Sequence, residues 1–282
     1  MTTFADSQDR LRRLFDKRLI LIVGATRWGT AWVQHCMDAH PDICAKGEGH
    51  FTDVLFPKIA KAFDDYNIES EKIGNRLQLA GLPGTAAGYT FDDVDHMLKT
   101  AIGLALDRWL NGRDPECIVE KTPEHVLSLE LLDRVLPEAS IIHVVRDGRD
   151  EAISAWEFNL GISRGDFPNQ YPSFASFVET FAQAWGRSIG SARKYGRRNP
   201  GRYLEIKCED IGADTSGVVS AILEFAQVQT SVEISRACTD EAWDVSPLDL
   251  EHGIWQSTFD SEAHRLFKRH GGELLKLLGY ES

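Results

Sequence analysis

The sequence lacks three features that would each assign it to a particular class of protein: paired cysteines, a long apolar run and an excess of positive charge. No run of about 18 apolar residues occurs, so we predict no membrane span. The net charge of −12 disfavours nucleic acid as a partner and requires any anionic ligand to be held by a local cluster of positive groups. The five cysteines are widely scattered and form no Cys-x-x-Cys pair, which favours reduced thiols over a disulfide framework or a zinc site.

Targeting and metal-binding signals are lacking as well. Residues 1–18, MTTFADSQDRLRRLFDKR, alternate in charge where a secretory signal would need about 7–15 apolar residues, so we expect a cytoplasmic protein. The histidines show no His-Glu-x-x-His spacing, and we predict no metal site; His143 alternates with apolar strand residues and is expected in the core. Without internal repeats or a convincing domain boundary, residues 1–282 are expected to form one domain.

What the chain does contain is an alternation of apolar strand candidates and helical stretches. The unbroken apolar run Leu19–Val23 is typical of a strand buried on both faces. Further strands are predicted at 117–120, 140–145 and 202–206, and helices near 9–17, 31–40, 91–111, 124–136, 147–160, 173–195, 215–227 and 260–278. This alternation predicts an α/β fold with a central parallel sheet flanked by helices. Segments 68–90 and 161–172, rich in Gly, Pro and polar residues, are expected to be excursions from that core.

A glycine loop follows the first predicted strand. In GATRWGTAWV, which begins at Gly24, the two glycines have P-loop spacing, but Thr30 stands where that motif has its lysine, and Arg27 lies inside the loop. A glycine turn that leads into a helix offers backbone N–H groups and the positive end of the helix dipole to an anion. Arg27, Thr30 and these amides are therefore candidates for gripping a terminal phosphate-like group. The alternative is a tight strand-to-helix turn with no ligand.

A second candidate anion site follows the strand predicted at 140–145. Arg146 stands where this strand ends, and Ser154 lies eight positions on, inside the next predicted helix. Ligands of open α/β sheets bind beyond the carboxyl ends of the strands, so this arginine and the glycine loop point to one rim. A guanidinium fork and a hydroxyl along a helix suit a second phosphate. Taken alone, RDGRD at 146–150 is equally compatible with an ion-pair network.

Together the two motifs resemble those of the sulfotransferases that use 3'-phosphoadenosine 5'-phosphosulfate (PAPS). ATRWGTAW is similar to their 5'-phosphosulfate loop, usually Pro-Lys/Arg-Ser-Gly-Thr-Thr-Trp, and VVRDGRDEAIS is similar to their 3'-phosphate motif, in which Arg and Ser stand eight apart. The resemblance extends to GEGHF at 47–51, EKTP at 120–123, GRYLEIKCEDI at 201–211 and the closing LLKLLGY. It implies a P-loop-like three-layer fold, PAPS as co-substrate and transfer of its sulfuryl group to a hydroxyl or amine, without a metal.

The resemblance also implies roles for individual residues. Arg27, Thr30 and the loop amides would hold the 5'-phosphosulfate, and Lys121 would be a second cation near the sulfuryl group. Arg146 and Ser154 would hold the 3'-phosphate. These contacts serve a reaction that, like phosphoryl transfer, depends mainly on positioning and electrostatic stabilisation.

Four loop positions carry further expectations. Trp28 takes the place of the family's usual serine and Ala31 that of its second threonine, so that with Gly29 they are expected to bind the donor through the backbone. Trp32 matches the family's loop tryptophan, which stacks on adenine, although its helical periodicity alone is more typical of a core position.

The general base is assigned through the same resemblance. In the cytosolic small-molecule branch a histidine follows Lys-Thr directly, but here that place is Pro123, and His125 lies two residues further on. The glycosaminoglycan-modifying branch and many bacterial members use a glutamate in a Glu-x-His-Phe segment about twenty residues after the loop. Glu48 of GEGHF fits that pattern and is the predicted base, since a carboxylate is ionised at neutral pH, with His50 beside it as a positioning group. The alternative is that Glu48 and His50 pair structurally.

Two other functions and the acceptor stay open at this stage. A P-loop-like nucleotide kinase or NTPase would want a magnesium-binding hydroxyl where Ala31 stands, and a non-catalytic nucleotide-binding module is the third candidate. The acceptor is expected to be a small molecule or a glycan bound by segments 52–100 and 155–185. Whether the chain forms a homo-oligomer is likewise left open.

Overall fold

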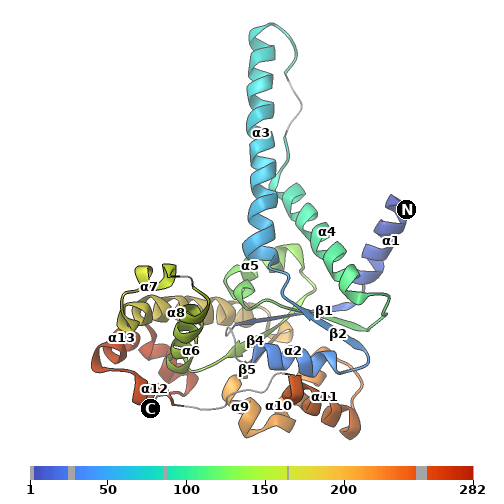
Figure 1. Cartoon of the computed structure of the whole chain (residues 1–282). Helices are drawn as coiled ribbons and strands as arrows, with labels where there is room; N and C mark the ends of the chain where they lie inside the picture. The colour runs from blue at the N-terminus through green and yellow to red at the C-terminus, as the bar shows by residue number, and fades with distance from the viewer. Residues whose placement is uncertain (1–2, 25–28, 85–87, 164, 246–252, 282) are drawn as a thin grey trace.

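The computed structural model describes residues 3–24, 29–84, 88–163, 165–245 and 253–281, arranged around one parallel sheet (Figure 1). The strands follow the order β2-β3-β1-β4-β5 across the sheet. Their bounds are β1 (Arg18–Gly24), β2 (Ile43–Gly47), β3 (Cys117–Lys121), β4 (Ser140–Val145) and β5 (Tyr203–Lys207). Each neighbouring pair is parallel, so all five carboxyl ends meet along one edge.

Helices cover both faces of this sheet, which confirms the predicted α/β fold. One face packs on α2 (Thr30–Asp38), α9 (Cys208–Ala213), α10 (Thr215–Ala226) and α11 (Val232–Val245). The other packs on α1 (Phe4–Phe15), α4 (Phe91–Leu110), the 3₁₀ turn η2 (Pro123–Ser128), α5 (Leu129–Val135) and part of α8 (Phe174–Arg198). None of the described helices is both long and apolar enough to cross a lipid bilayer.

The place of β1 at the centre of the sheet explains why its sequence is an unbroken apolar run. Ile20 and Ile22 point into the core on the α2 face, whereas Leu21 and Val23 point into the core on the α8 face. His143 of β4 is fully buried, as expected, and its Nδ1 lies 2.8 Å from the Tyr203 hydroxyl. Burial of both faces is what a central strand between two helical layers requires.

A third group of helices extends the fold beside the end of β4. A small core joins α6 (Gly148–Ile162), α8 and α13 (Ser261–Leu278). The shorter elements are α7 (Asp166–Gln170), η3 (Pro200–Arg202) and α12 (Trp255–Thr258). This group carries the 146–154 motif and the last helix of the chain together.

Several parts of the chain differ from the sequence-based expectation, including α7, α9 and α11, which the helix predictions omit. β2, which the strand predictions omit, lies at the sheet edge beside β3. The segment from residue 56 to 79, whose second half was expected to be an irregular excursion, is the 24-residue helix α3 (Phe56–Leu79), which follows the short π-helical turn η1 (Phe51–Leu55) and projects away from the sheet (Figure 1). Pro57 in the first turn suits a helix start, where its missing N–H costs no intrahelical bond.

Candidate active site

A cavity of about 540 Å³ opens at the carboxyl edge of the sheet. The start of α2, the ends of β2 and β3 and the middle of α6 contribute its walls; the lining residues are Thr30, Ala31, Glu48, Lys121, Pro123, Glu124, Ala155, Phe158 and Asn159. The strand register explains part of this assembly, because Gly47 at the end of β2 lies opposite Lys121 at the end of β3. Four residues predicted from distant motifs therefore share one cavity: Thr30, Ala31, Glu48 and Lys121.

The glycines of the first loop are required by close packing against β4. Gly24 has φ +117°, and a Cβ there would lie 2.2 Å from the carbonyl oxygen of Val144. Gly29 has φ +86°, and a Cβ there would lie 2.8 Å from Cγ1 of Val144. Residues other than glycine are strained in this backbone region. Arg27 and Trp28, between these glycines, lie outside the described residues.

The N-terminus of α2 faces the cavity. Gly29 is the N-cap residue and makes no side-chain capping bond, while Thr30 and Ala31 of the first turn line the cavity wall. Helix N-termini present N–H groups and a positive dipole end, which together suit an anion. Trp32 in the same turn is fully buried, with its ring edge-on to Trp243 at a centroid distance of 5.7 Å, so in this conformation it offers adenine no exposed face.

Glu48 and Lys121 of the cavity lining form a charged group with His50, which lies beside them outside the lining. Lys121 Nζ donates a hydrogen bond to Glu48 Oε1, and His50 Nε2 lies 3.3 Å from Glu48 Oε2. The other ring nitrogen of His50 lies 2.8 Å from Asp53 Oδ2, and this hydrogen bond raises the pKa of His50. A carboxylate, an ammonium and an imidazole thus lie in contact with one another around Glu48, whose side chain is partly exposed.

A second layer lies beneath this group and is completely buried. Glu120 Oε1 accepts hydrogen bonds from the backbone N–H of Gly49 at 2.9 Å and from the Thr122 hydroxyl at 2.5 Å. The Thr122 hydroxyl oxygen also accepts from the backbone N–H groups of Gly49 and His50, at 3.1 and 3.3 Å. The backbone directly after Glu48 is therefore held in place by Glu120 and Thr122.

Burial gives this layer unusual protonation behaviour. Loss of hydration raises the pKa of Glu120 to about 7, and the same effect lowers the pKa of His125 to about 4. The two side chains approach at 3.4 Å between His125 Nε2 and Glu120 Oε2, and His125 Nδ1 lies 2.8 Å from the Thr52 hydroxyl. Because His125 is neutral and Glu120 is partly protonated near pH 7, this contact is not a standing ion pair.

The second predicted motif occupies the junction of β4 and α6. Arg146 is buried directly after β4, and Ser154 lies half-buried in α6 one residue before Ala155 of the cavity wall. Neither Arg146 nor Ser154 is among the residues that line the cavity.

The other charges of RDGRD serve the structure. The Arg149 guanidinium forms two hydrogen bonds to Asp147, at 3.0 and 2.6 Å, donates to the Tyr280 carbonyl and lies 3.7 Å from the ring centre of Trp255. Asp150 accepts hydrogen bonds from the backbone N–H groups of Gly253 and Trp255. Within this motif, the ion-pair interpretation is thus confirmed for Asp147 and Arg149.

Comparison with known proteins identifies the family of this chain. The model of the sulfotransferase family matches residues 20–231, which include both motifs, Glu48 and Lys121. The chain belongs to the sulfotransferase family. Within residues 3–24, 29–84, 88–163, 165–245 and 253–281, no group of three or more His, Cys, Asp or Glu side chains is arranged to hold a metal ion.

Two curated relatives match parts of this sulfotransferase. An uncharacterized protein of Aquifex aeolicus is 23% identical over 214 residues, 75% of this chain and 26% of the relative. Human protein-tyrosine sulfotransferase 1 is 33% identical over 137 residues, 48% of this chain and 32% of the relative. The chain therefore spans about a quarter to a third of the length of the curated relatives it matches.

Solved sulfotransferase structures share the fold. Sulfotransferase STF9 from Mycobacterium avium has a TM-score of 0.56 and 16% identity, covering 97% of this chain and 80% of that chain. Mouse sulfotransferase SULT7A1, solved in complex with PAP, has a TM-score of 0.55 and 14% identity, covering 98% of this chain and 95% of that chain. The P-loop-like sulfotransferase fold predicted from the two motifs is thereby confirmed.

Several site residues escaped the sequence-based reasoning. Glu120 and Thr122 support the Glu48 segment, yet neither was given a role in the site. Phe158 and Asn159 line the cavity and were predicted only as part of segment 155–185, expected to bind the acceptor. One signal was available for Glu120: it is a charged residue at the end of the apolar strand CIVE. A carboxylate at a buried strand position needs compensating hydrogen bonds, which marks it as a structural or functional group.

Proposed function

We propose that this chain transfers the sulfuryl group of PAPS to a hydroxyl or amine of a small-molecule or glycan acceptor. The observation that carries the proposal is the cavity in which Glu48 and Lys121 face the N-terminus of α2. A base, a cation and an anion-binding helix end are the three groups that sulfuryl transfer needs at the reacting atoms. The mouse protein was solved with PAP, which is PAPS without its sulfuryl group, and this supports the donor assignment through likeness of fold.

The proposed reaction assigns one role to each group. A bond forms between the acceptor atom and sulfur while the bond from sulfur to the bridging oxygen of the 5'-phosphate breaks. The acceptor proton passes to the Glu48 carboxylate, and PAP departs with the bonding electron pair. Lys121 and the amides at the start of α2 stabilise the negative charge that develops on the leaving phosphate, with Arg27 as the predicted second cation.

The contact between Lys121 and Glu48 fits both roles. The Lys121 ammonium, which is only 11% exposed, donates a hydrogen bond to the Glu48 carboxylate. When Lys121 turns to the leaving oxygen, Glu48 Oε1 gives up this hydrogen bond and can accept the proton of the acceptor. His50, held by Asp53, keeps the second carboxylate oxygen oriented.

The donor's 3'-phosphate is assigned to Arg146 and Ser154 on the β4–α6 junction. Ser154 directly precedes Ala155 of the cavity wall, which suits a donor that carries its two phosphate groups on the 3' and 5' oxygens of one ribose. Trp28, Gly29, Thr30 and Ala31 contribute the loop backbone of the 5' site. We do not assign the adenine to Trp32, because its ring is covered by the core.

The Glu48→Gln substitution tests the proposal most directly. The amide keeps the size of the side chain but cannot accept the acceptor proton, so turnover should fall by roughly 10²–10⁴-fold. The measurement is transfer of labelled sulfate from PAPS across a panel of alcohols, phenols, amines and sugars. PAP should still raise the melting temperature of this variant without magnesium, because its binding site is unchanged.

A control variant and two further outcomes distinguish the proposal from the other functions considered for this site. Glu130→Gln removes a carboxylate that is 74% exposed on α5 and should leave turnover unchanged. Wild-type turnover in Glu48→Gln would exclude Glu48 as the base. Stabilisation by ATP only with magnesium would favour a kinase or NTPase, and PAP binding without transfer to any acceptor would favour a non-catalytic module. A single domain and a cytoplasmic location stay predictions from the sequence.

A further inference from the structure

A second, smaller cavity lies beside the proposed active site, between η2, β4 and α8. Its volume is about 160 Å³, and Pro123 and Glu124 line both cavities. Much of its wall is apolar and comes from η2, β4 and α8; the apolar side chains include Val126, Leu127, Val145, Phe181 and Ile189. An apolar cavity of roughly 150 Å³ is large enough for a benzene-sized molecule. The volume and the walls therefore suit one small ring.

Two of the lining side chains each hold a buried ring nitrogen that lacks a partner. His143 is fully buried and Trp185 is 4% exposed, and among the described residues neither His143 Nε2 nor Trp185 Nε1 has a hydrogen-bond partner. Leaving such atoms unpaired costs free energy, and most buried polar atoms in proteins do find a partner. Two unpaired nitrogens on the walls of one cavity indicate that its occupant carries a polar group as well as a ring.

The hydrogen bonds behind His143 determine which role its Nε2 has. Arg193 donates two hydrogen bonds to Glu205, at 2.9 and 2.6 Å, and the Tyr203 hydroxyl donates to the same carboxylate at 2.9 Å. Because a hydroxyl has only one proton, this hydroxyl must accept from His143 Nδ1, which lies 2.8 Å away. Burial lowers the pKa of His143, so the ring is neutral and its Nε2 is a hydrogen-bond acceptor.

Trp185 offers the opposite role, because an indole N–H can only donate. The cavity walls thus carry one acceptor and one donor, and a hydroxyl group can satisfy both. An ammonium group could not accept from Trp185. An anion would meet the side chains of Glu124 and Glu151, which also line the cavity. The walls therefore favour a neutral hydroxyl over either charged group.

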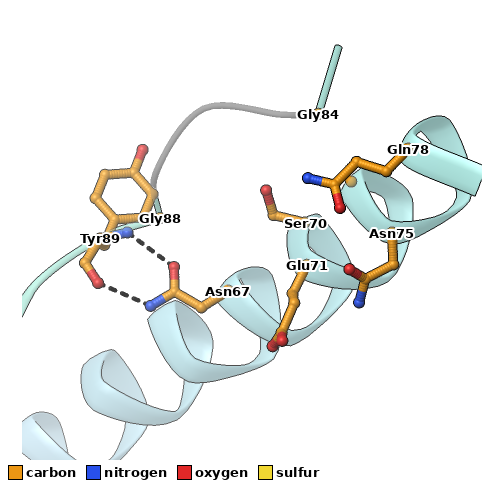
Figure 2. A pocket seen from close by; sticks show the side chains of 9 residues that line it. Asn67, Ser70, Glu71, Asn75, Gln78, Gly84, Gly88 and Tyr89 are labelled. Atoms are coloured by element: carbon orange, nitrogen blue, oxygen red, sulfur yellow. Dashed lines mark hydrogen bonds between the residues drawn. The ribbon is translucent and has the colours of Figure 1, made fainter. Parts of the chain in front are cut away.

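The larger hollow along α3 provides a contrast (Figure 2). Its volume is about 390 Å³, and its lining side chains are mainly polar. The Asn67 amide is bonded to the backbone N–H and carbonyl oxygen of Tyr89, both at 2.8 Å, and Glu71, Asn75 and Gln78 are exposed. Bulk water satisfies exposed groups of this kind, so volume alone does not identify a ligand site. The buried nitrogens distinguish the smaller cavity.

We propose that the cavity between η2, β4 and α8 binds a small neutral ring that carries a hydroxyl group, such as a phenol or a cyclic alcohol. The hydroxyl donates to His143 Nε2 and accepts from the Trp185 N–H, while the ring packs on the apolar walls. Gly24, the first residue of the glycine loop, also lines the cavity, so the occupant lies next to that loop. The proposal rests on the cavity and its two nitrogens and does not depend on the proposed sulfuryl transfer.

Binding of phenol and toluene to the full chain provides the test, by ligand-observed NMR titration between about 0.1 and 5 mM. The two probes have nearly the same size, but only phenol has a hydroxyl. Phenol should bind in this range, and toluene should bind about tenfold more weakly or worse, because it leaves both nitrogens unpaired. For the same reasons of charge, benzoate and benzylammonium should bind more weakly than benzyl alcohol.

Two variants locate the binding to this cavity. Ala184→Leu fills part of the space, since Ala184 lines the cavity, and should weaken phenol and toluene alike by about tenfold. Trp185→Phe keeps an aromatic ring but removes the N–H, so it should weaken phenol several-fold and leave toluene unchanged. The matched control is Gln183→Leu, because Gln183 is exposed on the same helix, and it should bind both probes like the wild type.

Four results would overturn the proposal. They are the absence of saturable phenol binding, which would leave the cavity to water, toluene that binds as tightly as phenol, equal losses of both probes in Trp185→Phe, and wild-type phenol binding in a folded Ala184→Leu. Far-ultraviolet circular dichroism establishes that each variant is folded. Because every measurement is of binding, a failure of sulfuryl transfer would leave these results unaffected.

Discussion

Two clusters of buried polar side chains lie along the carboxyl edge of the sheet, and they differ in how fully their charges are satisfied. The Arg149 cluster, at the start of α6, gives its guanidinium a carboxylate, a carbonyl oxygen and an aromatic face. The Glu120 cluster, beneath Glu48, leaves Glu120 Oε2 and His125 Nε2 without a hydrogen-bond partner at their 3.4 Å contact. Burying an unsatisfied polar atom costs free energy that a fully bonded network avoids.

The two clusters differ in hydrogen bonding because they hold different parts of the chain in place. Around Arg149, the hydrogen bonds join α6 to the C-terminal segment, and Glu209 extends them by accepting from the Asp147 N–H and the Tyr280 hydroxyl. These contacts fix the backbone beside Arg146. The Glu120 cluster instead holds a short segment that carries the proposed base, and a carboxyl with a pKa near 7 changes its charge at working pH. One cluster is built for rigidity, and the other can respond to protons.

Arg149→Ala should produce the largest loss of stability and so provides the strongest test of this contrast. The substitution leaves Asp147 buried without its bidentate partner, and breaking a buried pair in this way costs about 3–5 kcal/mol. Urea unfolding followed by circular dichroism measures the free energy. Arg236→Ala, which removes a guanidinium 82% exposed on α11, should cost less than about 1 kcal/mol. Equal losses in the two variants would contradict the structural role of Arg149.

Glu120→Gln should have a smaller effect that depends on pH. The folded pKa of Glu120, about 7, lies above its ordinary value of 4.5, so its contribution to stability is complete below about pH 4.5 and is lost as the pH rises through 7. A difference of 2.5 pKa values corresponds to at most about 3 kcal/mol. The wild-type free energy of unfolding should therefore fall between pH 5 and 8 relative to that of Glu120→Gln, which cannot titrate.

The control for this comparison is again Glu130→Gln, which removes an exposed carboxylate. Its free energy of unfolding should depend on pH in the same way as that of the wild type. Because Gln can still accept from Gly49 and Thr122, the variant should fold and should keep the Glu48 segment in place. Parallel profiles for wild type and Glu120→Gln would show that Glu120 is ionised throughout. The two clusters would then not differ in their response to protons.

The parts of the site that depend on one strand and its next loop could be predicted from the sequence. The glycine loop follows an apolar run too regular to be anything but a buried strand, and Arg146 stands where a second such run ends. Local patterns of this kind place a residue at the carboxyl edge of the sheet, because parallel strands all end on that side. Glu48 and Lys121 came from family motifs, and the structure brings them into contact.

The parts that depend on non-sequential neighbours could not be predicted. β2 is five residues long and pairs with β3, which lies some seventy positions later, so nothing in ICAKG reveals the contact of Glu120 with Gly49. Asp150 likewise bonds to Gly253 and Trp255 across about a hundred residues. The same applies to α3: the polar composition of its second half obscured a helix that is covered on one side by the chain around Tyr89.

Asp53→Asn should give the smallest effect and isolates the contact that holds His50 beside Glu48. The hydrogen bond from Asp53 raises the pKa of His50, so its loss should lower that pKa, as followed by the NMR titration of the ring protons. A histidine with a raised pKa stabilises the fold below its unfolded pKa and loses this contribution as the pH rises through the folded value. Since His50 is 38% exposed, the change in unfolding free energy should stay below about 1 kcal/mol. An unchanged His50 titration would mean that Glu48, rather than Asp53, holds the imidazolium. The control is Asp65→Asn on α3, which should leave the pKa of His50 unaltered in either case.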